Sequence, residues 1–430
     1  MRVRWFAIAA VVGLWMVTIA LSYWKTGLFQ FIGDDFSIFY SQSRVLASGH
    51  FDLLYDTAAA EAIHQTLRSY ADGPGVPIWL VPAPIARLIP PTVYEKPTNL
   101  IFRGGPVPYP PLFACLLLPF TLPAPPVGFA LWTIVNAVAG FFLARRMALL
   151  FPPSQRLFVV VVALTSFPFV YALILGQPVL LLGVAVAEFY FCLREERDFR
   201  GGLWLSVLFF KPQYGILIAP WLVWKRRWSA VAGATLGCVA ILAAGMVATG
   251  VTPLLTYVQA IVADGDFNGQ SRLNGANMMV NWRGIVLNLA PNTPIQDCLL
   301  LVGLASILTV VILIPIMRGK WAPRASSFPY QFVALLVATV LATYHSHSHG
   351  LVLLAVPLAA ILTDPDLSAT TRAILRIGII VPTALFLISH SLQMVGVSYS
   401  VLLVALYADL AWRLAWTHDR TALNWLAQSE

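Results

Sequence analysis

Apolar runs of about 20 residues recur along this chain, and they constrain its fold more than any other feature. A helix needs about 20 apolar residues to cross the hydrocarbon core of a bilayer. With 59% hydrophobic and only 11% charged residues, a water-soluble fold would have too much apolar surface to bury. We therefore predict one all-α, polytopic integral membrane domain over 1–430, with about ten to twelve transmembrane helices. The predicted runs are 5–24, 111–122, 127–149, 156–175, 178–193, 202–224, 229–249, 298–317, 328–344, 350–363, 373–390 and 398–416.

Basic residues outnumber acidic ones, 27 Lys and Arg against 19 Asp and Glu, so the formal net charge is +8. The cations lie mostly in short connectors and form no dense patch, which excludes nucleic acid as a partner. Because basic residues accumulate in cytoplasmic loops, the pattern predicts that both chain ends are cytoplasmic. Arg145-Arg146 and the segment 194–200 fall on the other side. A half-helix or re-entrant segment within 111–224 would remove that conflict.

Two long polar connectors, 33–110 and 250–297, interrupt the apolar runs and are extracytoplasmic in this topology. The first begins with two adjacent carboxylates, Asp34 and Asp35, followed by apolar residues at helical spacing. We predict an amphipathic interfacial helix capped by Asp34 or Asp35, and a second helical stretch over 57–70. One aspartate can cap the helix while the other, partly desolvated, acts as a base, so capping and catalysis remain alternatives.

Three histidines, His345, His347 and His349, follow the ninth apolar run on the same predicted side as the aspartates. In an extended segment their spacing would point all three imidazoles to one side, whereas in a helix it would spread them around the axis. No cysteine or carboxylate nearby completes a tetrahedral metal site, so we expect neither a metal nor another cofactor. A proton shuttle or a hydrogen-bond donor to phosphate or sugar hydroxyls is favoured. Polar residues satisfied at a helix end are the alternative.

Lys211 stands well inside an apolar run, where a cation is costly unless it meets an anion or faces a polar cavity. Pro212 follows it and should break the helix there, exposing backbone polar groups. Snorkelling of Lys211 to an interface is the alternative. Gln177, at the Gly176–Pro178 break between two apolar runs, could face the same cavity, and we include Gln213 as a further substrate-binding candidate.

Other candidates for substrate contact lie in or beside the two connectors. Tyr109 precedes two prolines that open the second apolar run, so we expect it to fix the entry geometry first and contact substrate second. Arg44 is a cation on the predicted interfacial helix. The second connector offers amides, an aromatic ring and cations, including Arg283, that suit a sugar or phosphate, although an ordinary solvated loop would look similar. Its candidate residues are Arg272, Asn274, Asn277, Asn281, Trp282 and Arg283.

Several short motifs, taken in order, resemble glycosyltransferase family 87, which includes the mycobacterial mannosyltransferase of phosphatidylinositol mannoside synthesis. They are Asp35-Phe36 with Phe39-Tyr40, Tyr109-Pro110-Pro111, Gly176-Gln177, Lys211-Pro212-Gln213 and the histidine-rich entry to the tenth apolar run. The resemblance extends from the first connector to about residue 360 and implies a GT-C fold in the inner (plasma) membrane. It also implies transfer of mannose or another hexose or pentose from a polyprenyl-phosphate donor to a lipid or glycan acceptor, as in glycolipid biosynthesis of the cell envelope.

The resemblance also implies roles for individual residues. The family's loop aspartate corresponds to Asp35 and its histidine to His345 or His347, but His349-Gly350 stands where a Tyr-Asp pair is expected. Asp35 would act as the general base on the acceptor hydroxyl, with inversion at the sugar. Lys211, one histidine and Arg283 would stabilise the departing phosphate. We expect Asp35 and Lys211 to share one extracytoplasmic cavity. A flippase or transporter of lipid-linked sugars is the main alternative, and a non-catalytic scaffold the third.

Overall fold

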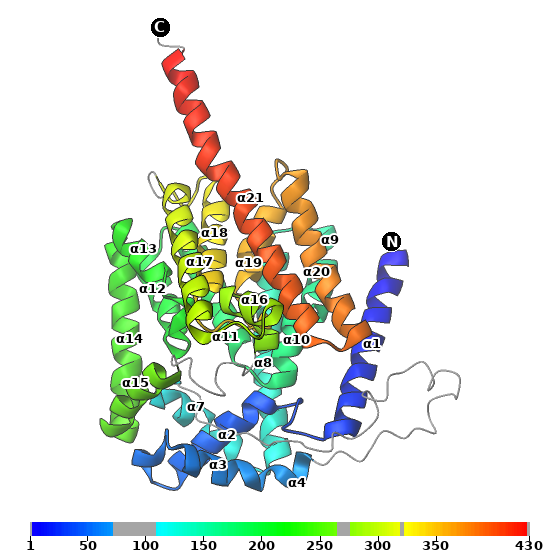
Figure 1. Ribbon diagram of the computed structural model, residues 1–430, viewed down its shortest axis with the longest axis vertical. Helices are drawn as coiled ribbons and strands as arrows, with labels where there is room; N and C mark the ends of the chain where they lie inside the picture. Colours follow the sequence, from blue (N-terminus) through cyan, green and yellow to red (C-terminus); the bar gives the residue numbers. More distant parts are fainter. Residues whose placement is uncertain (1, 72–108, 265–275, 319–321, 428–430) are drawn as a thin grey trace. The chain divides into compact units, whose positions relative to one another are not determined.

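The computed structural model describes residues 2–71, 109–264, 276–318 and 322–427 (Figure 1). This part of the chain is helical, and its only strand-like features are two isolated bridges, Leu28–Ile32 and Met279–His347. The described residues cluster into two compact units, and the chain passes from one to the other within α8 (Pro125–Ala148), α10 (Phe167–Leu175) and α14 (Trp228–Thr249). The first unit comprises 1–139, 170–178 and 239–264, and the second comprises 140–169, 179–238 and 265–430.

Six of the described helices are long and apolar enough to cross a membrane, which confirms an all-α polytopic membrane protein. A seventh span is possible if α9 and α10, which meet at a bend of 48°, act together. Most of the remaining predicted runs form shorter helices. The described residues therefore contain fewer membrane-length helices than the ten to twelve that the sequence predicted. The six spans are Trp5–Thr26, Pro125–Ala148, Trp228–Thr249, Ile295–Ile316, Ala369–Ser389 and Leu392–Leu414.

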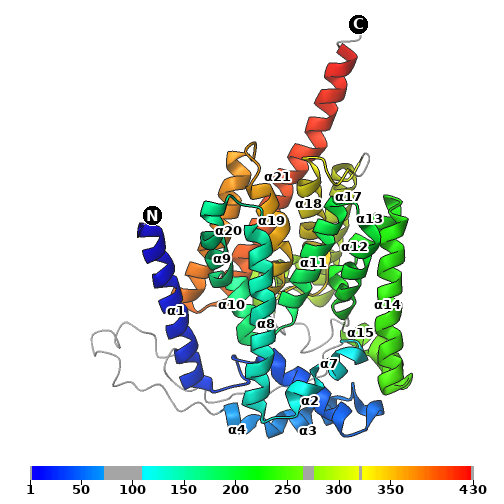
Figure 2. The same ribbon diagram turned by 180° about the vertical axis from the view of Figure 1, so that it is seen from behind.

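The first unit contains α1, three helices that lie crosswise to it, and parts of α8, α10 and α14 (Figures 1 and 2). The crosswise helices are α2, α3 and α4, as expected for elements in a membrane interface. Its elements are α1 (Arg2–Thr26), α2 (Asp34–Ala47), η1 (Phe51–Leu53), α3 (Thr57–Thr66), α4 (Arg68–Ala71), α7 (Pro111–Thr121), α8 (Pro125–Ala148), α10 (Phe167–Leu175), α14 (Trp228–Thr249) and α15 (Thr252–Asp264).

The helix α2 forms where the sequence predicted it, but its cap differs from the prediction. Gly33 is the N-cap residue, in the left-handed conformation at φ 80°, and no side chain caps the helix. Asp34 and Asp35 instead occupy the first turn, where the helix dipole favours negative charge. The prediction that one of them caps α2 is therefore wrong. By contrast, Asp56 caps α3, its side chain accepting from the Ala59 N–H at 2.7 Å.

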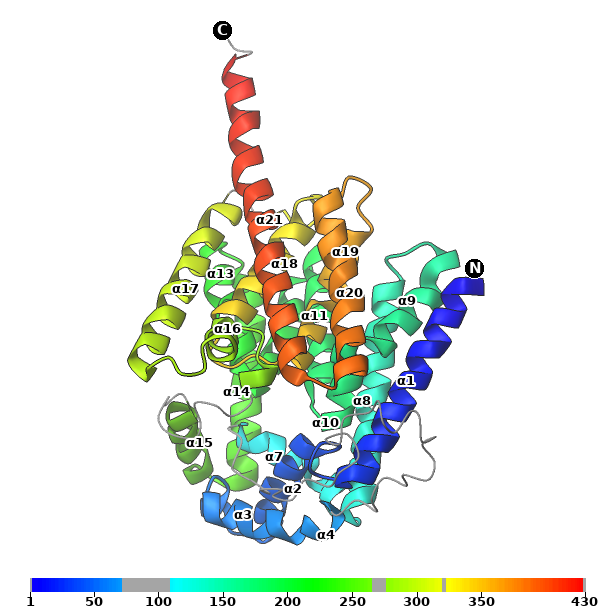
Figure 3. The ribbon, with the colours of Figure 1, turned by 45° about the vertical axis from the view of Figure 1, so that its right-hand side comes forward.

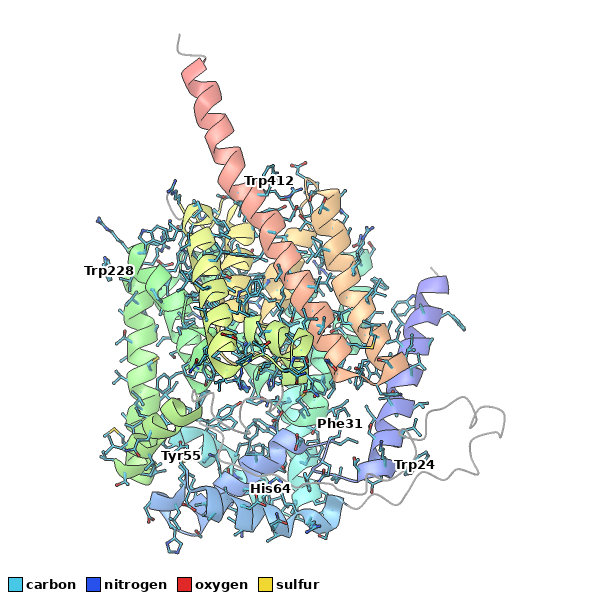
Figure 4. All side chains as sticks on the ribbon, in the orientation of Figure 1. Trp24, Phe31, Tyr55, His64, Trp228 and Trp412 are labelled. Atoms are coloured by element: carbon cyan, nitrogen blue, oxygen red, sulfur yellow. The ribbon has the colours of Figure 1, made fainter. Side chains whose placement is uncertain are left out.

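The second unit is built around α11 and α18, whose side chains are buried along most of their length. Figures 1 and 3 show α20 and α21 side by side within it. Its elements are α9 (Pro153–Thr165), α11 (Val179–Arg194), α12 (Asp198–Leu205), η3 (Ser206–Phe210), η4 (Pro212–Tyr214), α13 (Ile218–Trp224), η6 (Ala276–Met278), α16 (Trp282–Leu289), α17 (Ile295–Ile316), α18 (Phe328–Ala342), η7 (Ser348–Leu354), α19 (Ala355–Leu362), α20 (Ala369–Ser389) and α21 (Leu392–Ala427).

The run 202–224 does not form a single helix, contrary to the prediction of one crossing there. It is divided into α12, η3, η4 and α13, and the change of direction falls at Lys211, which has φ −137° and ψ 75°. Pro212 follows at once, so the predicted break at this proline is confirmed. The Lys211 N–H donates to the Leu208 carbonyl at 2.8 Å, and the Lys211 carbonyl accepts from the Tyr214 N–H at 3.1 Å. The backbone of the break is thus hydrogen-bonded even though the helix is not continuous.

One cation that conflicts with the predicted topology has a partner inside the protein. Arg146 forms an ion pair with the buried Glu188 of α11, with Nε and Oε1 separated by 2.6 Å. Its guanidinium also lies 4.4 Å from the centroid of the Phe191 ring. Because this arginine is held by a specific partner, its position says little about which side of the membrane the α8 end faces.

Candidate functional site

The two carboxylates of the first unit stand where two glycines let backbones approach closely. The Gly33 N–H donates to the Ile174 carbonyl at 2.6 Å, and Trp132 Nε1 donates to the Gly176 carbonyl at 2.6 Å. A Cβ added at Gly176, where φ is 76°, would stand 2.7 Å from the Phe36 Cβ. The start of α2, which carries Asp34 and Asp35, therefore packs against the Gly176-Gln177 break between two apolar runs. Two motifs that are far apart in the sequence belong to one structural feature.

Burial raises the pKa of the half-buried Asp34 carboxyl well above its usual range, and the adjacent Asp35 carboxylate raises it further. A like-charged pair that is partly removed from water resists carrying two negative charges at once. Both carboxylates also act electrostatically on the buried Tyr171 hydroxyl of α10. The sequence reasoning missed Tyr171, because nothing local marks it out among the apolar residues of its run.

Tyr109 and Gln177 contact each other in the first unit, both of them buried. The Tyr109 hydroxyl donates to Gln177 Oε1 at 3.3 Å, and the Tyr55 hydroxyl donates to the Tyr109 carbonyl. The Tyr109 ring stacks on Phe113 with centroids 4.4 Å apart. These contacts hold Tyr109 in place just before α7, as expected for a residue that fixes the entry geometry of that helix.

Arg44 lies apart from the carboxylates. Nine residues of helix separate it from Asp35, about 14 Å at 1.5 Å per residue. It is exposed, and its Nη1 reaches the Thr121 carbonyl only at 3.5 Å. The structure therefore joins Arg44 to the C-terminal end of α7 and not to the aspartates.

His345 and His347 of the second unit lie on an extended segment between α18 and η7, and His349 lies in the first turn of η7; we call residues 345–349 the histidine segment. The ring centroids of His345 and His347 are 4.3 Å apart, and those of His347 and His349 are 5.3 Å apart. The extended alternative is confirmed for His345 and His347, whose alternate side chains gather on one side, whereas His349 belongs to the 3-10 helix η7. Among the described residues, no group of three His, Cys, Asp or Glu side chains could hold a metal ion. Independence from metals remains a prediction.

The second connector holds this histidine segment in place. Met279 and His347 form an isolated antiparallel bridge, and the Val280 N–H donates to the Ser346 carbonyl at 2.8 Å. Asn281 Nδ2 donates to the Thr343 carbonyl at 2.7 Å, while its Oδ1 accepts from the Gly284 N–H at 2.9 Å and caps α16. Asn281 therefore has a structural role and does not offer its amide to a sugar.

The structure describes two of the other candidates of the second connector, Trp282 and Asn277. Trp282 Nε1 donates to Thr309 Oγ1 at 2.9 Å, so its indole is engaged within the protein. Asn277 lies in η6, and its carbonyl stands close to Gly396 of α21. Arg272 and Asn274 lie outside the described residues.

Two buried cations stand beside the imidazoles. Lys211 is 8% exposed and Arg283, on α16, is 4% exposed. Burial, and then the charges of Lys211 and Arg283, lower the pKa of His345 to about 3. Burial, the neighbouring histidines and the same two cations lower the pKa of His347 well below its usual value. The imidazoles of His345 and His347 are therefore neutral near pH 7, and they donate or accept hydrogen bonds instead of carrying charge.

One polar atom in this segment, His347 Nε2, is buried without a hydrogen-bond partner in the described part of the chain. Unsatisfied buried polar atoms are uncommon in proteins, and a bound ligand is one way to satisfy them. With Lys211 and Arg283 alongside, the ligand chemistry that fits best is an anion bearing several acceptor oxygens.

Gly350 follows the histidines where the family resemblance predicted an aspartate, and the structure supplies a reason. A Cβ added at Gly350 would overlap the hydroxyl of Tyr214, which is buried in η4. A side chain at 350 therefore has no room while Tyr214 is present. Gln213, next to Tyr214, is half-buried beside Lys211. The histidine segment and the Lys211 break are thus packed against each other through Tyr214.

Comparison with known proteins supplies a family. The model of glycosyltransferase family 87 matches residues 108–343, just over half of the 430 residues. The match includes Tyr109, Gln177, Lys211 and Arg283, whereas Asp35 and the histidines lie outside it. No curated protein and no solved structure matches the chain.

Proposed function

The chain belongs to glycosyltransferase family 87 and is a membrane glycosyltransferase, and we propose that its donor is a polyprenyl-phosphate sugar. The observation that carries this proposal is the group of two buried cations, Lys211 and Arg283, around neutral imidazoles in the second unit. A cation buried at membrane depth is costly and is typical of a binding site. A phosphate whose lipid tail stays in the bilayer is an anion suited to that position.

In this proposal the cations act on the leaving group. When the bond between the sugar anomeric carbon and the phosphate oxygen breaks, negative charge grows on the departing polyprenyl phosphate. Lys211 and Arg283 lower the barrier because they are already positioned where that charge develops. The neutral His347 donates a hydrogen bond to a phosphate oxygen, which would satisfy its buried Nε2. His345 and His349 support its orientation through their ring contacts.

Asp35 is the proposed general base. As the acceptor hydroxyl attacks the anomeric carbon, its proton passes to the Asp35 carboxylate, and the configuration at that carbon inverts in one displacement. Burial and the neighbouring Asp35 carboxylate raise the pKa of Asp34, which supports this role because a protonated Asp34 leaves the negative charge of the pair on Asp35.

The remaining features of the proposal come from the sequence. The sugar is mannose or another hexose or pentose, the acceptor is a lipid or glycan, and transfer takes place on the extracytoplasmic face of the plasma membrane. The crosswise helices α2 to α4 support an interfacial site, because they follow directly from the C-terminal end of α1 (Figure 2). No metal is required for the displacement described here.

The proposal is tested by transfer of radiolabelled sugar from a polyprenyl-phosphate donor by the purified full-length protein in lipid. We expect Asp35→Asn to lower kcat by about 100- to 10,000-fold, the usual contribution of general base catalysis. Asp52→Asn removes the same charge from an exposed position on η1 and should keep the wild-type rate.

Two outcomes would contradict the proposal. Wild-type transfer by Asp35→Asn would remove the base from the mechanism. Translocation of the labelled lipid across a vesicle bilayer without any sugar transfer would instead support the flippase alternative.

A further inference from the structure

A groove of about 430 Å³ lies in the second unit between α9, α19, α20 and α21, and one part of its lining, Leu351 and Val352, follows directly after the histidines. Its lining is apolar except for Ser166, Tyr399, Arg372 and Arg376. The volume lies within the range of sites that bind small ligands. We call it the α20 groove, and Figures 1 and 3 show the helices α20 and α21 that form one side of it.

The two arginines lie at one end of the groove. Because α20 begins at Ala369, Arg372 and Arg376 belong to its first two turns. Arg372 Nη2 donates to the Leu367 carbonyl at 3.2 Å, and Arg376 is exposed. A third arginine, Arg156, borders the lining, since its Nε donates to the carbonyl of Phe151 at 3.2 Å.

Two of the carboxylates near this end are engaged by other groups. Asp364 accepts a hydrogen bond from the Tyr330 hydroxyl at 2.7 Å. Asp409 accepts from the Thr371 hydroxyl and pairs with Arg413 at 3.1 Å. Within the described ranges, neither Arg372 nor Arg376 forms an ion pair with a carboxylate. The open end of an apolar groove thus carries two arginines that form no ion pair within the described ranges, and the exposed Asp366 is the remaining carboxylate near them in the sequence.

This end is distant from the histidine segment. The hydrogen bond between Tyr330 and Asp364 joins the start of α18 to the end of α19, whereas His345 follows the end of α18. The 15 residues of α18 rise about 22 Å. An anionic group held by Arg372 is therefore about 20 Å from one held by the histidine segment, and one phosphate cannot occupy both.

We propose that the α20 groove binds an anionic glycerophospholipid, with an acyl chain along the apolar lining and the phosphate at Arg372 and Arg376. Guanidinium groups match phosphate oxygens in geometry and charge, and basic pockets between membrane helices bind anionic headgroups. In the predicted topology Arg413, and hence this end of α20, faces the cytoplasm, where anionic lipids are concentrated. The site is separate from the proposed function and does not depend on it.

Native mass spectrometry of the purified full-length protein tests the proposal. It measures the binding of phosphatidylglycerol, with phosphatidylcholine as the neutral reference. We expect preferential binding of phosphatidylglycerol by the wild type. Arg372→Gln with Arg376→Gln should weaken it roughly 10- to 30-fold, as expected for two basic side chains at an anionic headgroup. Arg200→Gln with Arg226→Gln removes the same charge from exposed positions and should bind as the wild type does.

A second variant tests the groove without changing charge. Gly378 lines the groove, and a Cβ added there meets only Leu402 Cδ1, at 3.9 Å, so Gly378→Phe should fit and fill the space. It should abolish the preference for phosphatidylglycerol. Gly303→Phe, on α17 with nothing within 4 Å of its added Cβ, is the matched control.

Three results would overturn the proposal. They are unchanged phosphatidylglycerol binding by both the charge variant and the filled variant, equal binding of phosphatidylcholine by the wild type, and displacement of phosphatidylglycerol by stoichiometric polyprenyl phosphate. The last would show that the groove holds the isoprenoid chain of a donor. All three are measured without sugar transfer, so they do not depend on the activity proposed above.

Discussion

The hydroxyl of Tyr214 occupies the space that a side chain at Gly350 would need. This contact links the helix break at Lys211 to the first turn of η7, directly beside the histidine segment. Two stretches that the sequence separates by more than a hundred residues are packed together with no spare volume between them.

Gly350→Ala should therefore destabilise the second unit by about 1–3 kcal/mol, the usual cost of forcing extra atoms into a packed core. Thermal unfolding in detergent measures the effect. Gly350→Ala combined with Tyr214→Phe should recover part of the loss, because removing the hydroxyl oxygen makes room for the new methyl group. Equal stability of Gly350→Ala and wild type would contradict the packing described.

The low pKa of His345 predicts a pH dependence of stability. An unfolded histidine has a pKa near 6.5, so the unfolded chain binds more protons than the folded one between pH 6.5 and about 3. The stability from this neutral imidazole is complete above pH 6.5 and is lost as the pH falls toward 3. One proton contributes at most about 1.4 kcal/mol per pH unit. The thermal midpoint should thus fall from pH 6.5 to 4.5, and less steeply in His345→Gln.

The raised pKa of Asp34 has the opposite sign. The folded chain holds a proton on this carboxyl that the unfolded chain releases above about pH 4, so stability from this group decreases as the pH rises. Asp34→Asn removes the titrating group and should flatten the decrease without lowering stability at neutral pH. The measurement is the same thermal midpoint series, with Asp52→Asn as the exposed control. A clear destabilisation by Asp34→Asn at pH 7 would show that the carboxylate makes an essential contact.

Lys211 should matter more for catalysis than for stability. Lys211→Met should lower kcat/KM for the polyprenyl-phosphate donor by about 100- to 1,000-fold, the scale seen when one group that stabilises developing charge is removed. Lys211→Arg should keep part of the activity. Because a buried charge replaced by an apolar side chain is often neutral for folding, the thermal midpoint of Lys211→Met should change little. Lys225→Met, a half-buried cation bonded to the Met317 carbonyl, controls for general charge effects.

The shared cavity for Asp35 and Lys211 expected from the sequence remains a prediction. Cysteines introduced at Asp35 and His347 should be joined by a short bifunctional thiol reagent in the lipid-embedded protein if one donor molecule meets both. The product would be detected by peptide mapping. A cysteine pair at Asp52 and His347 is the control. Absence of cross-linking at Asp35 together with cross-linking at Asp52 would contradict a common site.

Local features of the sequence predicted much of the fold. Apolar length identified the long helices, and the proline after Lys211 identified a break, because backbone hydrogen bonding and proline geometry depend on neighbouring residues. The extended form of the backbone at His345 and His347 was one of two alternatives that spacing alone left open. The cap of α2 was predicted wrongly, since a favourable Asp was preferred over a glycine whose conformation depends on the backbone packed against it.

Only the tertiary structure decided which distant residues meet. The bridge between Met279 and His347, the cations Lys211 and Arg283 beside His345, and the Arg146–Glu188 pair all join segments far apart in the chain. Such contacts depend on how helices pack, and helix packing is set by side-chain shapes along whole surfaces that no short motif contains. The sequence by itself therefore determined that the chain spans a membrane and which residues are chemically capable. Packing determined which of those residues work together.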